Sequence, residues 1–283
     1  MSFDVGVGQY YETDSIIHRL DPRTKIFFIL SYMVSIFVAK EVLSFALLTV
    51  VFVLTFVLSK IPLRVIFKGL KPVLIIIFLT AIINMFLTKP EDPNIEPLFA
   101  LNIIPEKWTL SLYVEGLINA GILALRIVLL ILETSIFLSY ATTPIELTDG
   151  IELSLAPLKK IKMPVHELAM VMTIALRFIP TLIDETTKIM NAQKARGADY
   201  SSGGLIKRAK ALIPIIIPLF VSSFRRAEEL ATAMECRCYH GDNGRTRMKQ
   251  LRLSAKDFVG YFLSAAIIAG VILINIYLPI YSI

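Results

Sequence analysis

The sequence predicts an all-α integral membrane protein with about five transmembrane helices and a separate region of long amphipathic helices. Of its 283 residues, 55% are hydrophobic and only 18% are charged, against about 25% charged residues in an ordinary soluble domain. The mean hydropathy, +0.69, is correspondingly high. Long apolar runs occupy the first half of the chain and its C-terminal end, whereas the stretch between them alternates apolar and polar residues.

Five apolar runs are candidates for transmembrane helices, because a span needs about 20 residues. They lie at about 26–39, 42–58, 72–88, 112–140 and 258–280. The first run is short, so it must take in flanking residues or lie beside thinner lipid. A single bent helix over 26–58 is the alternative, but it would place Lys40 and Glu41 at the middle of the bilayer, where charge is costly.

The distribution of charge predicts how the chain is oriented in the membrane. Residues 141–256 hold 18 Lys and Arg against 11 Asp and Glu, whereas the remainder of the chain is close to neutral. The 60–71 loop carries four basic residues and no acidic one, and the 89–107 loop is acidic on balance. Basic loops stay in the cytoplasm, so the N-terminus, 60–71 and 141–256 are expected on the cytoplasmic side of the plasma membrane. Residues 89–107 and the C-terminus are expected on the outer side.

This topology divides the chain into three regions. Residues 1–140 form an N-terminal membrane domain of about four spans, 141–256 form a cytoplasmic region, and 257–283 form a C-terminal transmembrane helix. The cytoplasmic region is too long for a simple connection, and its apolar stretches are too interrupted to span the bilayer.

Two long amphipathic helices are expected within the cytoplasmic region. The first extends from Pro164, a favourable helix start, to Gly197, a favourable helix end. The second extends from about Lys207 to Glu235 and is expected to kink near its start at Pro214 and Pro218. At about 1.5 Å per residue, each helix reaches roughly 45 Å.

We call the two long helices the arms. One face of the second helix is apolar and is the candidate surface through which the arms pack. Its residues are Phe220, Phe224, Ala227, Ala231 and Met234. These side chains are expected to pack the two helices together or against a partner protein, since exposed apolar stripes of this length rarely go unused. The alternative is that the helices lie on the bilayer surface, as basic amphipathic helices often do.

An arginine stands at the end of each long helix, four positions after an alanine. The pairs are Ala192 with Arg196 and Ala233 with Arg237. The small neighbours Ala195 and Gly197 allow another backbone to approach, and a guanidinium grips carboxylates with two hydrogen bonds. A solvated arginine favoured by the helix dipole would explain one such site. Two equivalent sites favour docking onto two equivalent partners.

These features, with the N-terminal segment "SIIHRLDPRTKI" and the stretch "RFIPTL", resemble the transmembrane T component of energy-coupling factor (ECF) transporters. The likeness extends from residue 10 to residue 280. The stretches "KARG" and "AMECRCY" correspond to the paired Ala-Arg-Gly motifs of that family. The N-terminal segment matches the family's pattern at His18, Leu20, Asp21, Pro22 and Lys25.

The resemblance implies a non-catalytic scaffold without cofactors. In that family the T component joins two cytoplasmic ATPase subunits to a small membrane subunit that captures a vitamin or other micronutrient. Two coupling helices cross beneath the membrane, and their arginine-bearing ends dock on the ATPases. By this correspondence the ATPase-docking residues are Ala195, Arg196, Gly197 and Arg237.

The second motif departs from the family pattern, because Arg237 is flanked by Cys236 and Cys238. Cysteine is small, so docking is expected to survive, although the close approach that glycine permits is not assured. The alternative interpretation of this stretch is a metal site formed by these cysteines and His240. We do not expect one, because structural zinc takes four ligands at wider spacings.

Other functions fit the sequence less well. It contains no phosphate-binding Gly-rich loop, so ATP is not expected to bind in that way. Its basic character follows from membrane topology, and no nucleic-acid module is present. A conventional ABC-importer permease would not need two long arms. An intramembrane enzyme would rest on Glu115, Arg126 and Glu133, which share one helix face without a nucleophile.

Overall fold

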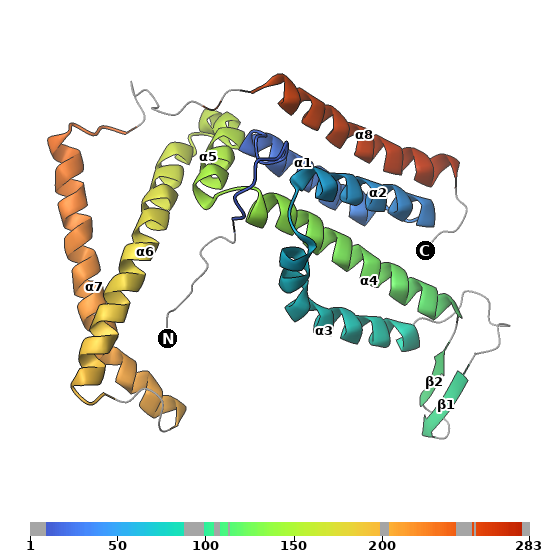
Figure 1. Cartoon of the computed structure of the whole chain (residues 1–283), viewed down its shortest axis with the longest axis horizontal. Coiled ribbons are helices and arrows are strands. Elements are labelled where there is room, and N and C mark those ends of the chain that lie inside the picture. The colour runs from blue at the N-terminus through green and yellow to red at the C-terminus, as the bar shows by residue number, and fades with distance from the viewer. Residues whose placement is uncertain are drawn as a thin grey trace. The chain divides into compact units, whose positions relative to one another are not determined.

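The computed structural model describes residues 10–87, 99–104, 108–112, 114–198, 204–241, 251 and 253–278. Two compact units make up the chain. The bundle consists of Met1–Ile151 with Leu251–Ile283, and the arm unit consists of Glu152–Gln250. The described elements, shown in Figure 1, are α1 (Pro22–Val38), α2 (Val42–Ser59), α3 (Leu63–Leu87), β1 (Phe99–Ile104), β2 (Trp108–Leu112), α4 (Val114–Thr134), η1 (Ser135–Tyr140), α5 (Pro144–Ser154), η2 (Ala156–Ile161), α6 (Val165–Ala195), α7 (Leu205–Cys236) and α8 (Ala255–Tyr277).

The predicted helical membrane architecture is confirmed. Helices α1 and α2 are separate, as expected, and are divided by an extended residue, Ala39, and by Lys40 and Glu41. Helix α1 begins at Pro22, so it takes in four residues ahead of the apolar run and still reaches only 17 residues. In Figure 1, α1, α2, α4 and α8 lie roughly alongside one another within the bundle.

The expected basic loop at 60–71 is wrong in part, because most of it is helical. Helix α3 begins at Leu63 and bends by 61° between its Leu63–Lys71 and Val73–Met85 portions (Figure 1). Proline lacks the amide hydrogen that would continue the helical ladder, so Pro72 is the natural place for this bend.

Four further elements were not expected from the sequence. Strands β1 and β2 form an antiparallel hairpin within and beside the predicted outer loop, with an irregular register between Asn102 and Ile104. The residues of both strands include the aromatic and β-branched types that favour extended structure. Helix α5 and the short 3-10 helix η2 occupy the start of the region that was expected to hold only the two arms.

Four described helical segments are long and apolar enough to cross a membrane: α2, Gly116–Tyr140 of α4 and η1, α6, and α8. The two bent portions of α3, taken together, raise the number to five. By length and composition alone α6 also qualifies, although the sequence predicts that this region is too interrupted to span. Helix α6 is nevertheless the least apolar of the four, and its side chains are the least buried.

The first and last helices of the bundle pack along each other and are joined at their starts by one carboxylate. Asp257 Oδ1 accepts the Asp21 amide at 2.8 Å and the Thr24 hydroxyl at 3.2 Å. Its Oδ2 accepts the Ser254 amide at 2.7 Å, which completes a capping box at the start of α8. Asp21 in turn caps α1 by accepting the Arg23 amide at 2.9 Å.

The other end of α8 is also fixed to its neighbours. The Asn275 side chain donates to the Val38 carbonyl at 2.8 Å and accepts from the Ser44 hydroxyl at 3.0 Å. Between the two ends, α8 approaches α1 closely at Gly260, where an added Cβ would lie 2.6 Å from the Thr24 methyl. Polar side chains at both ends and a glycine between them therefore set the register of α8.

The N-terminal segment folds back against the start of α1. The Lys25 side chain is only 1% exposed, and its ammonium donates to the His18 carbonyl at 3.2 Å and the Ala141 carbonyl at 2.7 Å. Burial lowers the pKa of His18, so its ring is neutral near pH 7. Because the Tyr11 carbonyl 3.0 Å away can only accept, Nε2 carries the proton and Nδ1 accepts from the Ser15 hydroxyl.

The intramembrane charges of α4 stabilise helix packing rather than form a reactive cluster. Arg126 donates to the Ala39 carbonyl at 3.1 Å, at the C-terminal end of α1, and its guanidinium lies 5.1 Å from the Phe45 ring centre on α2. Glu133 is buried and accepts from the Thr55 hydroxyl at 3.0 Å. The arginine therefore contacts both α1 and α2, and the side chain of Glu115 lies outside the described residues.

We expect Asp257→Ala to lower the thermal unfolding midpoint of the purified chain by several degrees. The substitution leaves the buried Asp21 amide and Thr24 hydroxyl without an acceptor, which costs about 1–3 kcal/mol. Asp257→Asn retains one acceptor oxygen, so its unfolding midpoint should lie between those of the parent chain and Asp257→Ala. The control is Asp14→Ala, which breaks an exposed ion pair with Arg19 and should leave the midpoint unchanged. Equal midpoints for Asp257→Ala and the parent chain would contradict this role.

Candidate functional site

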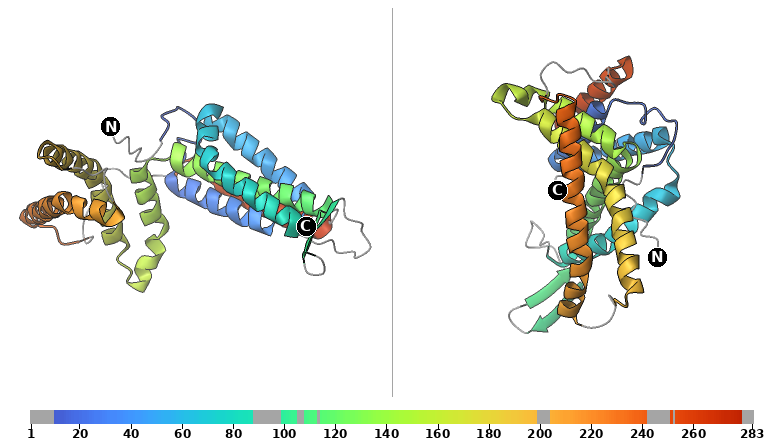
Figure 2. Two further views of the ribbon diagram at one scale, coloured as in Figure 1. Left: turned by 90° about the horizontal axis from the view of Figure 1, so that it is seen from below. Right: turned by 90° about the vertical axis from the view of Figure 1, so that its left-hand side faces the viewer.

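The two predicted arms are present as α6 and α7, with 31 and 32 residues. Both are within about two residues of their expected bounds, and α7 continues through both of its prolines while its axis changes direction near its start (Figure 1). Figure 2 shows the two helices side by side and running in opposite directions. Arg226 on α7 donates to the Glu185 carboxylate on α6 at 3.2 Å, which links them near their crossing.

Both arms end in the same backbone motif. At the end of α6, the Gly197 amide donates to the Lys194 carbonyl at 2.9 Å and the Ala198 amide to the Gln193 carbonyl at 3.0 Å. Gly197 has a φ of +87°, in the left-handed region. These bonds define a Schellman motif, which satisfies the last carbonyls of the helix.

The end of α7 repeats this motif without glycine. The Cys238 amide donates to the Glu235 carbonyl at 2.9 Å, and the Tyr239 amide to the Met234 carbonyl at 3.1 Å. Cys238 takes the left-handed position with a φ of +55°. Cysteine therefore replaces glycine in the family pattern without changing the course of the backbone.

Arg196 and Arg237 are the C-cap residues of these two motifs, so the chain places them equivalently. Both are exposed, as are Ala195 and Gly197. Neither guanidinium has a hydrogen-bond or ion-pair partner among the residues that the structure describes. Because α7 starts close in sequence to the end of α6 and runs back beside it, the two arginines lie at opposite ends of the helix pair.

The expected apolar face of α7 is on the outside of the arm unit. Phe220 and Phe224 are 62% and 61% exposed, and their ring centres lie 4.6 Å apart. Ala227 and Ala231 are also exposed, whereas Met234 is partly buried. On α6, the apolar side chains of Ile179, Leu182 and Ile189 are half-buried. This face of α7 is thus exposed among the described residues.

The start of α6 depends on an interaction that sequence analysis missed. His166 Nδ1 lies 3.0 Å from Glu152 Oε1, and the glutamate is almost fully buried. His166 belongs to the first turn of α6, but its partner belongs to α5. A separation of 14 residues across a turn and a 3-10 helix carries no periodic signal.

Both cysteines beside Arg237 are free thiols and are exposed. Among the described residues, no group of three or more histidine, cysteine, aspartate and glutamate side chains is arranged to hold a metal ion.

Comparison with known proteins identifies the family. The family described as CbiQ, cobalt transport protein, matches residues 13–248. The chain is 51% identical over 275 residues to the energy-coupling factor transporter transmembrane protein EcfT of Clostridium kluyveri, covering 97% of this chain and 98% of the relative. It is 45% identical over 251 residues to the protein of the same name from Bacillus subtilis, covering 89% and 91%.

The chain belongs to the family of ECF transporter T components. It is therefore a multi-pass membrane subunit of a transporter, as the resemblance of its motifs predicted. The relative from Lactococcus lactis, 44% identical over 276 residues, covers 98% of this chain and 97% of its own length, so the likeness includes both the bundle and the arm unit.

We expect Cys238→Gly to stabilise the last turn of α7 in this T component. A residue other than glycine in the left-handed region is strained, so relief of that strain should slow amide hydrogen exchange of the turn about two- to fivefold. Cys236→Gly is the matched control, because Cys236 is the last helical residue and glycine weakens a helix there. Exchange that changes in the same direction in both variants would contradict the assigned role of Cys238.

Proposed function

We propose that this T component is a non-catalytic scaffold that couples ATP hydrolysis by two cytoplasmic ATPase subunits to the uptake of a vitamin or other micronutrient. The nutrient is captured by a separate small membrane subunit. The observation that carries the proposal is that both helix ends have the same backbone motif, and each presents an exposed arginine, Arg196 or Arg237, with no partner among the described residues.

The arginines are better suited to docking than to stabilising their own helices. A cationic side chain near a helix C-terminus interacts favourably with the last carbonyls and the helix dipole. In both arms, however, backbone amides of the Schellman motif already satisfy those carbonyls at Gln193 and Met234. The guanidinium groups of Arg196 and Arg237 remain available for carboxylates of a partner, which they can bind through two parallel hydrogen bonds.

The spacing of the two ends suits one scaffold with two similar partners. An α-helix of 32 residues is about 48 Å long, so the ends lie far enough apart for each arginine to engage a different ATPase subunit. Equivalent backbone geometry at both ends favours equivalent docking grooves on the two subunits. Ala195 and Gly197 at the first end, and the cysteines at the second, keep the surroundings of the arginines small.

The exposed apolar face of α7 is the proposed surface for the substrate-capture subunit. Phe220 and Phe224 supply a large apolar contact, and Ala227 and Ala231 lie one helical turn apart on the same side. Small residues at that spacing let another helix approach closely, as in membrane helix pairs. Movement of the arms on the ATPases would then be transmitted directly to the subunit that holds the nutrient.

The orientation in the membrane follows from the charges. We place the N-terminus, the first turns of α3 and the 141–256 region in the cytoplasm, and β1, β2 and the C-terminus outside the plasma membrane. Helix α6 passes the criteria of length and composition for a span, but its weaker apolarity and the polar residues along it favour a position at the membrane surface.

We expect Arg196→Ala and Arg237→Ala each to weaken binding of the ATPases to the T component, and the double variant to lose both. Removal of one partner from a desolvated charge pair costs about 2–5 kcal/mol. The measurement is the amount of each ATPase that copurifies with the chain from gently solubilised membranes. Arg→Lys should rescue poorly if two parallel hydrogen bonds are needed.

Arg225→Ala is the matched control for these variants. Arg225 is also exposed and belongs to α7, but it lies three turns from the helix end. Its replacement should leave the copurified ATPases unchanged. Retention of both ATPases at normal stoichiometry by the double variant would exclude docking through the arginines.

We expect Ala231→Trp to separate ATP hydrolysis from transport. Tryptophan at this exposed position blocks close helix approach on the apolar face and leaves both arginine ends intact. The assembled complex should hydrolyse ATP at a normal rate but take up less nutrient for each ATP. A face that simply lies against lipid headgroups would tolerate tryptophan, so normal uptake per ATP would refute the partner role of this face.

A further inference from the structure

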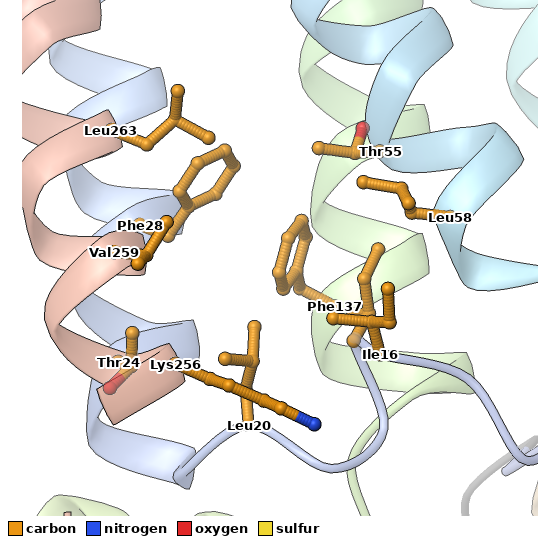
Figure 3. Close-up of a pocket in the computed structure, with 12 residues that line it drawn as sticks. Ile16, Leu20, Thr24, Phe28, Thr55, Leu58, Phe137, Lys256, Val259 and Leu263 are labelled. Carbon is orange, nitrogen blue, oxygen red and sulfur yellow. The ribbon is translucent and has the colours of Figure 1, made fainter. Parts of the chain in front are cut away.

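A cavity of about 320 Å³ opens between α2 and α8 at the end of the bundle where α8 begins (Figure 3). Its wall is formed by apolar side chains of α1, α2, η1, α8 and the N-terminal segment. Phe28, Phe137 and Leu263 line its inner part. Lys256, at the start of α8, is the one charged residue among its lining residues.

The cavity exists because α8 is held to α1 along its length and to α2 only at its other end. There, Asn275 accepts from the Ser44 hydroxyl of α2 at 3.0 Å. Near its start, α8 lies tightly against α1 at Gly260 and Thr24. Leu58 of α2 and Val259 of α8 face each other across the resulting gap (Figure 3).

The lining offers almost nothing to a polar ligand or to water. The Thr24 hydroxyl donates to Asp257, and the Thr55 hydroxyl donates to the Phe52 carbonyl and the Glu133 carboxylate. A water molecule needs two to four polar partners to occupy a buried site, and an apolar cavity without them stays dry or takes an apolar guest.

We propose that this cavity binds one acyl chain of an anionic phospholipid, whose headgroup phosphate pairs with the Lys256 ammonium. Lys256 is exposed and has no hydrogen-bond or ion-pair partner among the described residues. It lies one turn before Val259 and two turns before Leu263 on the same side of α8. Along the helix axis, the charged group is therefore followed by the apolar wall of the cavity. This is the polarity of a phospholipid, with a charged head and an apolar tail.

The position of the lysine agrees with the proposed topology, on which this inference rests for the choice of leaflet. Lys256 is the last residue of the basic 141–256 region, which the proposed topology places in the cytoplasm, so it faces the cytoplasmic leaflet. Anionic lipids are attracted to basic residues near a membrane surface by about 1 kcal/mol per charge, which is about a fivefold preference.

The test uses the full chain alone in lipid nanodiscs of phosphatidylcholine that contain a trace of phosphatidylglycerol with a diazirine in one acyl chain. After irradiation, labelled peptides are identified by mass spectrometry. We expect the label to concentrate on residues that line the cavity, namely Phe28, Leu58 and Leu263. Even labelling of all lipid-facing helix surfaces would overturn the proposal.

Two variants distinguish the tail from the headgroup. Val259→Trp fills the cavity and should reduce labelling there at least fivefold, whereas Ile276→Trp, near the other end of α8, should not; the two residues are 66% and 64% exposed. Lys256→Gln should reduce labelling by the phosphatidylglycerol probe about fivefold and leave a matching phosphatidylcholine probe unchanged. Lys160→Gln, an exposed lysine of η2, is the control for loss of charge.

Each remaining outcome decides the proposal. Leu263→Phe is a second variant that fills the cavity less. It is used if gel filtration shows that Val259→Trp does not fold. Unchanged labelling in a folded filling variant, or an equal effect of Lys256→Gln on both probes, would overturn it. Labelling that disappears in the assembled transporter would assign the cavity to a partner subunit instead. Because the chain is tested without ATPases, and Arg196→Ala should label normally, failure here is separate from failure of the docking hypothesis.

Discussion

The bundle depends on a single carboxylate that serves the starts of two helices. The first amides of a helix have no partner within it, and a buried amide has no water to replace that partner. Asp257 supplies the acceptor for the backbone at Asp21 and at Ser254, which are more than 230 positions apart. Helices α1 and α8 therefore begin at one point, and the side chain of Asn275 closes the opposite end. This double attachment makes the first and last helices one packed pair, and the other helices of the bundle pack around it.

Much of this fold follows from local sequence, and its exceptions have physical causes. Apolar runs of sufficient length predict α2, α4 and α8, because a membrane span needs about 20 predominantly apolar residues. The basic residues from Lys60 to Lys71 predict a loop, yet lysine and arginine are good helix formers. Charge alone does not separate a loop from an interfacial helix turn. The hairpin of β1 and β2 depends on pairing between two short segments, which neither segment specifies by itself.

The candidate site is predictable in part for the same reason. A proline at the start and a glycine after the end gave the bounds of α6, because both residues act on the backbone locally. The left-handed conformation of Cys238 cannot be predicted from the sequence, since cysteine does not favour it. The structure shows it, with a positive φ at Cys238 as at Gly197. The pair of Glu152 and His166, and the cavity between α2 and α8, arise from segments that no periodic pattern connects.

The two exposed thiols beside Arg237 have a practical consequence. They are the only cysteines in the 283 residues, and both belong to the last turn of one arm. A thiol-reactive dye or spin label added to the unmodified protein therefore attaches at one known place and nowhere else. The distal end of α7 can be followed by spectroscopy through a working cycle without first removing cysteines elsewhere, and shielding of the thiols from reagent would report when that end is covered.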